Sequence, residues 1–87
     1  MDKKQFTIEE AKPIAESIGI DWSKADFTIE DFMNGLNVEL EHGSRDPETN
    51  VTNDDPITTG KIALAHLKEF GDYYVRLAQM EREAENK

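Results

Sequence analysis

Apolar side chains recur three or four residues apart in four stretches of this chain, the spacing that places them on one face of an α-helix. The predicted helices cover residues 8–17, 29–42 and 56–70, and a fourth starts near residue 73 after Gly71-Asp72. Thr7 and Thr28 stand where a helix cap is expected, each followed three residues later by the acidic residue of a capping box. Asp55-Pro56 is a cap followed by proline at the first helical position.

These elements predict an all-α fold of four short helices in a compact orthogonal bundle. Helix 56–70 carries apolar groups on more than one face, so we expect it at the centre of the bundle. Residues 1–80 form a single domain in this interpretation, and residues 81–87 form a charged, frayed C-terminal tail. Trp22 lies in the first connector. It is expected to be buried in the core of the bundle, because it is too large an apolar group to leave in water.

A polar loop, residues 43–55, joins the second and third predicted helices and is long for a domain of this size. Its aspartate, asparagine and threonine side chains can close turns on their own backbone, so the loop is predicted to be ordered. Val51 is its one strongly apolar residue, and both histidines of the chain lie near its edges. Such a loop is typical of a site or an interface.

Charge narrows the classes of partner. Nineteen acidic and ten basic side chains among 87 residues give a net charge of −9, so direct nucleic-acid binding is disfavoured for want of a basic surface. An acidic surface suits a basic protein partner or a nucleic-acid mimic, or it simply keeps the domain soluble. The longest apolar run is four residues, Ile62-Ala-Leu-Ala65, so no membrane segment is predicted. Without cysteine, the chain is expected to be cytoplasmic.

The best candidate chemistry is a pair of helical patterns, Glu39-Leu-Glu-His42 before the loop and His66-Leu-Lys-Glu69 after it. Residues three apart share a helix face, so Glu39, His42, His66 and Glu69 are the candidate ligands of a divalent metal, in a metal-binding protein or a metal-dependent hydrolase. The structural alternative makes His66 a core-edge histidine bonded to the loop, with both glutamates as solvated boundary residues. No other cofactor is implied, and the absence of phosphate-binding and nucleophile motifs favours a non-enzymatic role.

Four segments of the chain are similar to segments of other proteins. They are Gly35-Leu-Asn-Val-Glu-Leu-Glu-His-Gly43, Asp46-Pro-Glu-Thr-Asn-Val-Thr-Asn-Asp-Asp-Pro56, Thr59-Gly-Lys-Ile-Ala-Leu-Ala-His-Leu67 and Asp72-Tyr-Tyr74. Together they resemble a family of small uncharacterised proteins of bacteria, archaea and phages. That family has no assigned activity, cofactor or partner. The resemblance implies that the loop and its flanking helices are the defining element of the family.

The interpretation that fits these patterns best is a non-enzymatic protein-protein interaction module, for which a phage or mobile element is the setting that we consider. Its partner is an unknown protein, and the chain is expected to be a monomer or a weak homodimer. The alternatives are the metal site and, more weakly, nucleic-acid mimicry. The interface candidates surround the loop and the end of the second helix; they are Val38, His42, Arg45, Val51, Asn53, Asp54 and Tyr73.

Overall fold

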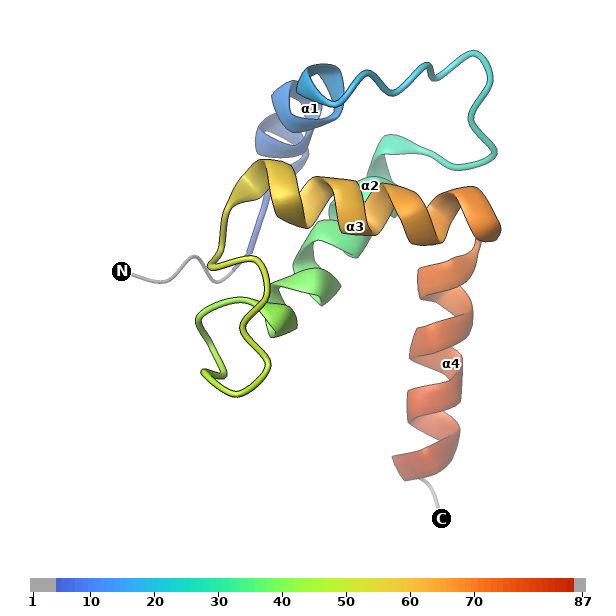
Figure 1. Ribbon diagram of the computed structural model, residues 1–87. Coiled ribbons are helices and arrows are strands. Elements are labelled where there is room, and N and C mark those ends of the chain that lie inside the picture. The colour runs from blue at the N-terminus through green and yellow to red at the C-terminus, as the bar shows by residue number, and fades with distance from the viewer. Residues whose placement is uncertain (1–4, 86–87) are drawn as a thin grey trace.

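The computed structural model describes residues 5–85, which form four α-helices and one 3₁₀ turn, with no strand in that range. The all-α prediction is therefore confirmed. In chain order the elements are α1 (Ile8–Ser17), α2 (Ile29–Glu39), η1 (Leu40–His42), α3 (Pro56–Glu69) and α4 (Tyr73–Glu85). Figure 1 shows α2 and α3 crossing at the centre, with α1 on one side and α4 leaving from the far end of α3.

Local capping chemistry fixes the helix starts, as the sequence predicts. The Thr7 hydroxyl accepts from the backbone N–H of Glu10 while the Glu10 carboxylate accepts from the Thr7 N–H, and Thr28 with Asp31 repeats this box at the start of α2. Asp55 accepts from the N–H of Thr58 at the start of α3. Each box satisfies backbone donors that a helix N-terminus would otherwise leave unpaired.

Two helix ends differ from the prediction. The segment predicted as one helix over 29–42 divides at residue 39, and its last three residues tighten into η1, where the Gly43 N–H donates to the carbonyl of Leu40. At the C-terminus, α4 continues to Glu85, so the predicted tail is helical over 81–85. Residues 86 and 87 lie outside the described residues.

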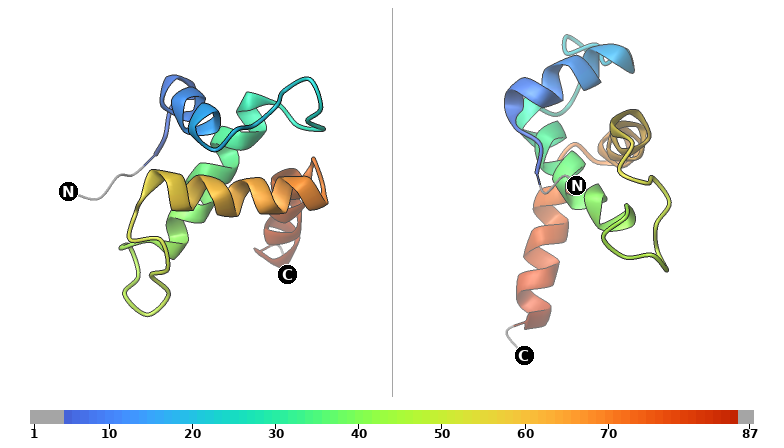
Figure 2. Two further views of the ribbon diagram at one scale, coloured as in Figure 1. Left: turned by 45° about the horizontal axis from the view of Figure 1, so that its top comes forward. Right: turned by 90° about the vertical axis from the view of Figure 1, so that its left-hand side faces the viewer.

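The core lies where α1 and α3 pack on α2. Phe32, Leu36 and Leu40 of α2 are almost fully buried and meet Ala63 and Leu67 of α3. Gly60 lets α1 approach α3 closely: a Cβ there would lie 2.8 Å from Cγ2 of Ile14. Figure 2 shows from two further sides that α1 and α3 both lie against α2, so α2 shares the central place that the sequence assigns to helix 56–70 alone.

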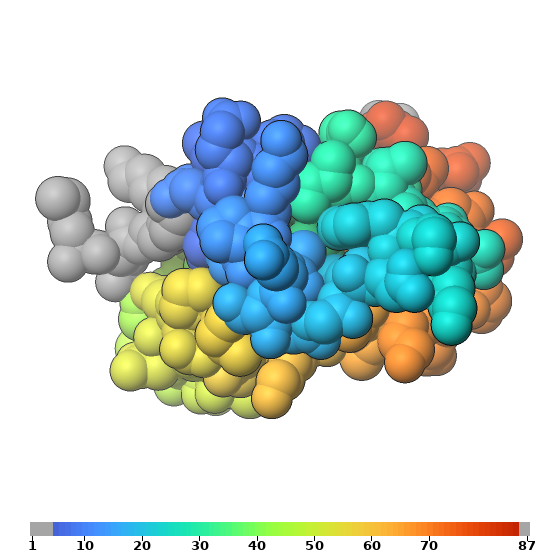
Figure 3. All heavy atoms as spheres, turned by 90° about the horizontal axis from the view of Figure 1, so that it is seen from above, coloured from blue at the N-terminus to red at the C-terminus, as the bar shows by residue number. Residues whose placement is uncertain are grey.

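Trp22 is not buried in the core of the bundle, contrary to the prediction. Its side chain is 41% exposed, and it packs edge-on against Phe27 and Phe32, whose ring centroids lie 5.7 and 6.5 Å away. Phe32 fills the position that was expected for the tryptophan. Trp22 instead covers Phe32 from the connector between α1 and α2, which Figure 3 shows running over the face of the molecule beside α1.

None of the helices within residues 5–85 combines the length and the apolar character that crossing a membrane requires. The loop, residues 43–55, folds back against the end of α2 (Figure 1). The structure thus places the loop and α4 at different edges of the α2–α3 centre. Both edges matter for the candidate site.

Candidate functional site

Hydrogen bonds within the loop hold it in one conformation. Val51 and Thr52 donate their backbone N–H groups to the carbonyl oxygen of His42 at 2.6 and 3.1 Å, and the Thr52 side chain is buried. Asn53 and Asp54 adopt left-handed backbone conformations, with φ of 50° and 63°, which asparagine and aspartate tolerate better than most residues. The ordered loop predicted from its turn-forming residues is confirmed.

Asp54 clamps the start of the loop to its end. Its carboxylate accepts from both the backbone N–H and the hydroxyl of Ser44, and these bonds hold the pKa of the Asp54 carboxyl below its ordinary value. Gly43 leaves the room that the clamp needs, because a Cβ at that position would overlap Oδ1 of Asp54. Asp54 is therefore a structural residue of the loop, although the sequence marks it as an interface candidate.

A buried carboxylate joins three helices beneath this loop. Glu39, at the end of α2, is only 3% exposed, so it is not the solvated boundary residue of the structural alternative. Its Oε2 accepts from the hydroxyl of Tyr74 on α4 at 2.7 Å and lies 3.0 Å from Nδ1 of His66 on α3. With Nδ1 protonated, both donors converge on one carboxylate oxygen, which offsets the cost of removing that charge from water.

Tyr74 reaches Glu39 because α2 has a glycine one turn earlier. A Cβ at Gly35 would lie 2.6 Å from Cε2 of Tyr74, so only glycine lets the ring lie flat against α2. The tyrosine is 6% exposed, and it is the buried residue of α4. We call Glu39, His66 and Tyr74 the buried triad after its two buried members, Glu39 and Tyr74; the His66 side chain is 30% exposed. Sequence patterns identified Glu39 and His66 but missed Tyr74, which is 35 residues from its acceptor.

His66 contacts Glu39 and Tyr74, whereas the structural alternative predicted that it would bond to the loop. Its ring stacks on Tyr73 with the centroids 4.4 Å apart and the planes within 3°. Nδ1 of His66 also lies 3.1 Å from the Tyr74 hydroxyl, so both tyrosines of α4 contact this histidine. The start of α4 is thus held by one stacked ring and one buried ring.

Three of the four predicted metal ligands lie near one another. Nε2 of His42 is 3.8 Å from Oε1 of Glu39, and His66 contacts the other oxygen of that carboxylate. Glu69, the fourth, is exposed at the end of α3 and forms no ion pair or hydrogen bond with them within the described residues. Within residues 5–85, no group of three or more histidine, aspartate or glutamate side chains is arranged to hold a metal ion. Metal binding stays a prediction.

The interface candidates divide among three places. His42, Arg45, Val51 and Asn53 are exposed on or beside the loop, and the Val51 side chain is 73% exposed. Tyr73 is half-buried against His66. Val38 lies apart from these, in a groove between α2 and α4.

This groove, the α2–α4 groove, has a volume of about 550 Å³. Val38 and Tyr74 form apolar parts of it, and Val75 and Ala78 of α4 line the other wall. Polar side chains complete the lining; they are Gln5, Asp31, Asn34, Asn37, Glu41 and Arg82. The ring of Tyr74 therefore contributes to both the buried triad and the groove, so the triad sets the position of the α4 wall.

Comparison with known proteins assigns the chain to a family. A family model described as a protein of unknown function, DUF5661, matches residues 11–83. The chain belongs to the DUF5661 family. The match begins within α1 and ends within α4, so the buried triad and the whole lining of the α2–α4 groove except Gln5 fall within the matched residues. No curated protein and no solved structure matches the chain.

High pH is expected to unfold this DUF5661 domain through Tyr74. Burial raises the pKa of Tyr74 far above its ordinary value, and the hydrogen bond to Glu39 and the negative charge of that carboxylate raise it further. Because unfolded tyrosine ionises near pH 10, the stability that protonated Tyr74 contributes is complete below about pH 10 and declines as the pH rises above it. The expected loss is up to about 1.4 kcal/mol per pH unit.

Urea unfolding followed by circular dichroism between pH 7 and pH 11 measures this loss. The Tyr74→Phe variant is the control, because phenylalanine keeps most of the ring packing but has no proton to lose. The free energy of unfolding of the wild type should fall more steeply above pH 10 than that of the variant. Parallel pH curves for the two proteins would show that Tyr74 does not couple folding to ionisation.

Proposed function

We propose that this protein is a non-enzymatic interaction module whose α2–α4 groove binds an amphipathic helix with a basic polar face from a partner protein. The observation that carries the proposal is the exposed state of α4. Of its residues Tyr73–Glu85 only Tyr74 is buried, while Val75 and Met80 are 56% and 59% exposed. A helix of this length gains little stability in water without packing partners. A partner helix in the groove would supply that packing.

The shape and composition of the groove favour a helical occupant. It lies between two helices, and its apolar residues Val38, Tyr74, Val75 and Ala78 come from both walls. Grooves of this kind accept the apolar face of an amphipathic helix. Figure 1 shows α4 pointing away from α1, and its groove residues Val75 and Ala78 are exposed.

Charge favours a basic partner. Asp31 and Glu41 line the groove against a single cation, Arg82, and the whole chain carries a net charge of −9. A field of this sign speeds the approach of a basic surface and disfavours an acidic one. The same excess of carboxylates argues against a nucleic acid as the direct ligand.

The test uses a synthetic amphipathic peptide built from leucine and lysine, with binding measured by isothermal titration calorimetry. A scrambled peptide of the same composition has the same charge but no apolar face. We expect saturable binding of the amphipathic peptide, weaker binding of the scrambled one, and a modest decrease in affinity at high salt. Amide NMR shifts should be confined to the two walls of the groove.

Two variants of α4 locate the binding surface. Ala78→Lys places a cation in the groove, and Met80→Lys makes the same charge change at an exposed residue outside its lining. Only Ala78→Lys should abolish peptide binding. Equal loss in both variants, or equal binding of the scrambled peptide, would reduce the interaction to general charge attraction and overturn the proposal.

Divalent-metal binding is the alternative function, favoured by the position of His42 and His66 on either side of the Glu39 carboxylate. The buried triad already uses Oε2 of that carboxylate, so a metal ion would have to compete with Tyr74 for it. Titration with zinc while following the amide NMR signals of His42 and His66 separates the two functions. Saturable shifts at both histidines, lost in His42→Ala, would support the metal site.

A further inference from the structure

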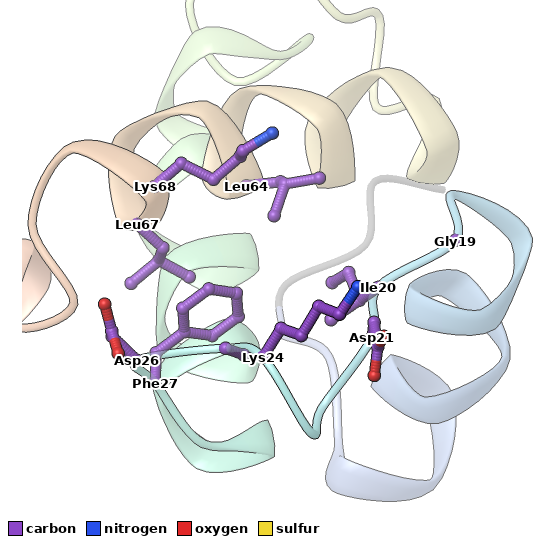
Figure 4. A pocket seen from close by; sticks show the side chains of 10 residues that line it. Gly19, Ile20, Asp21, Lys24, Asp26, Phe27, Leu64, Leu67 and Lys68 are labelled. Carbon is purple, nitrogen blue, oxygen red and sulfur yellow. The ribbon is translucent and has the colours of Figure 1, made fainter.

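A second hollow lies on another face of the molecule, between the connector that follows α1 and the helix α3. Its volume is about 360 Å³, within the range of small-molecule sites. The apolar part of its lining comes from Ile20 and Phe27 of the connector and from Leu64 and Leu67 of α3. We call this hollow the connector cleft; Figure 4 shows these side chains facing the same space.

Two lysines flank the connector cleft, and neither has a carboxylate partner. Lys24 extends from the connector and Lys68 runs along α3, so each wall of the cleft carries one lysine (Figure 4). In the part of the chain that the structure describes, neither ammonium group forms an ion pair. Among the described residues, Lys12, Lys61 and Arg82 likewise form no ion pair, so it is their position beside an apolar cleft that distinguishes Lys24 and Lys68.

The two aspartates of the lining do not neutralise these lysines by contact. Asp21 is engaged in its own turn, where its Oδ1 accepts from the backbone N–H and the hydroxyl of Ser23 at 3.0 and 2.6 Å. Asp26 lies beside Phe27 at the opposite edge from the two ammonium groups (Figure 4). An apolar surface with two available cations at its mouth therefore remains.

We propose that the connector cleft binds a small amphipathic carboxylate, a molecule with an apolar chain or ring and one carboxylate group. The apolar part would cover Phe27, Leu64 and Leu67 and remove their exposed area from water. The carboxylate would lie between Lys24 and Lys68, since hydrogen bonds between ions are stronger than neutral ones. The site is independent of the α2–α4 groove and shares none of its lining residues.

The structural alternative concerns Lys68 alone. It lies in the last turn of α3, where a cation stabilises the negative end of the helix dipole. That role would make Lys68 matter for stability but would not require Lys24, an apolar cleft, or any ligand. The experiment therefore measures ligand binding at both lysines and does not rely on stability.

Octanoate is the probe, because it has a flexible apolar chain and one carboxylate. The fluorescence of Trp22 reports on the cleft, because its ring packs against Phe27. Trp22 is the only tryptophan of the chain, so the signal comes from this residue alone. We expect a saturable change in its fluorescence, with amide NMR shifts centred on Phe27 and Leu64. Two comparison ligands separate the apolar contribution to binding from the charged one. 1-Octanol keeps the apolar chain without the charge, and acetate keeps the charge without the chain. Both should bind at least about tenfold more weakly than octanoate.

Three lysine variants complete the test. Lys24→Met and Lys68→Met keep an apolar stem and remove the charge, and each should weaken octanoate binding by about tenfold. Lys61→Met is the matched control, on the same helix as Lys68, exposed and outside the cleft lining. Because all three side chains are exposed, circular dichroism should show the wild-type fold in each variant.

Two results would overturn the proposal: equal affinity for octanoate and 1-octanol, or equal effects of Lys61→Met and Lys68→Met. The first would leave only an apolar surface, and the second only a general attraction of anions to lysines. The Ala78→Lys variant links this test to the proposed function. It should leave octanoate binding unchanged, so failure at one site can be told from failure at the other.

Discussion

Replacing Tyr74 by alanine should lower the free energy of unfolding by about 3–5 kcal/mol, the usual cost of removing a buried aromatic ring. It should also release α4 from the bundle. Tyr74 is the buried residue of α4, and its hydroxyl donates the 2.7 Å hydrogen bond to Glu39. Without the ring, the pocket left against Gly35 would have nothing in α4 to fill it.

Hydrogen exchange measured by NMR separates loss of α4 from general unfolding. In Tyr74→Ala, the amides of α4 should exchange almost as fast as in an unfolded chain, while those of α2 and α3 keep protection in proportion to the remaining stability. Val75→Ala is the control on the next residue, which is 56% exposed, and it should change stability by less than about 0.5 kcal/mol. Uniform loss of protection over all helices would contradict a specific role in holding α4.

The same variant connects the fold to the proposed function. The α2–α4 groove exists only while α4 stays at its angle to α2, and Tyr74 lies in the lining of that groove. Tyr74→Ala should therefore also abolish binding of the amphipathic peptide. The connector cleft lies on other elements, so octanoate binding to the part that remains folded should persist.

The sequence was sufficient to predict where the helices begin, because the residues that cap each helix lie beside its start in the chain. Thr7 and Thr28 form both halves of a capping box with residues three positions away, so no knowledge of the tertiary fold is needed. The end of α2 was harder to predict. The apolar pattern continues through Leu40, and only the backbone shows that residues 40–42 tighten into a 3₁₀ turn.

The candidate site could be predicted only in part, because its partners are distant in the chain. Glu39 and His66 share a triad across 27 residues, and the sequence could mark them as chemically capable without showing that they meet. Glu39 lies at the boundary of the apolar stripe of its helix. It is buried because Tyr74 covers it, and nothing near Glu39 in the sequence indicates that contact.

For Trp22 the sequence suggested a burial that the structure does not show. Its size suggested a core position, yet Phe32 of α2 occupies the centre and is fully buried, while the tryptophan covers its edge. A hydrophobicity argument ranks residues by their tendency to be buried, but the backbone decides which of two large side chains can reach the centre. The regular position of Phe32 on α2 made it the better choice.

Glu39→Met should cost about 2–3 kcal/mol of stability, the second largest effect that we expect. The exchange keeps the length of the side chain but removes the acceptor of two donors, the Tyr74 hydroxyl and Nδ1 of His66. A donor left unpaired in a buried site costs about 1–3 kcal/mol. This cost applies to the Tyr74 hydroxyl, whereas the His66 side chain is 30% exposed and regains part of its loss from water. Removing a buried charge also recovers some of its desolvation penalty, which offsets part of the cost.

A double-mutant cycle with Tyr74→Phe decides whether the loss comes from the unpaired hydroxyl. Tyr74→Phe alone removes one donor from a carboxylate that keeps His66, and it should cost about 1–2 kcal/mol. After Glu39→Met the tyrosine hydroxyl loses its carboxylate acceptor and keeps only Nδ1 of His66, 3.1 Å away, so removing the hydroxyl as well should cost less than it does in the wild type. We therefore expect a coupling of at least about 1 kcal/mol in urea unfolding at pH 7. Additive losses would mean that Glu39 and Tyr74 stabilise the bundle separately, and that α4 is held by packing against Gly35 without help from the hydrogen bond.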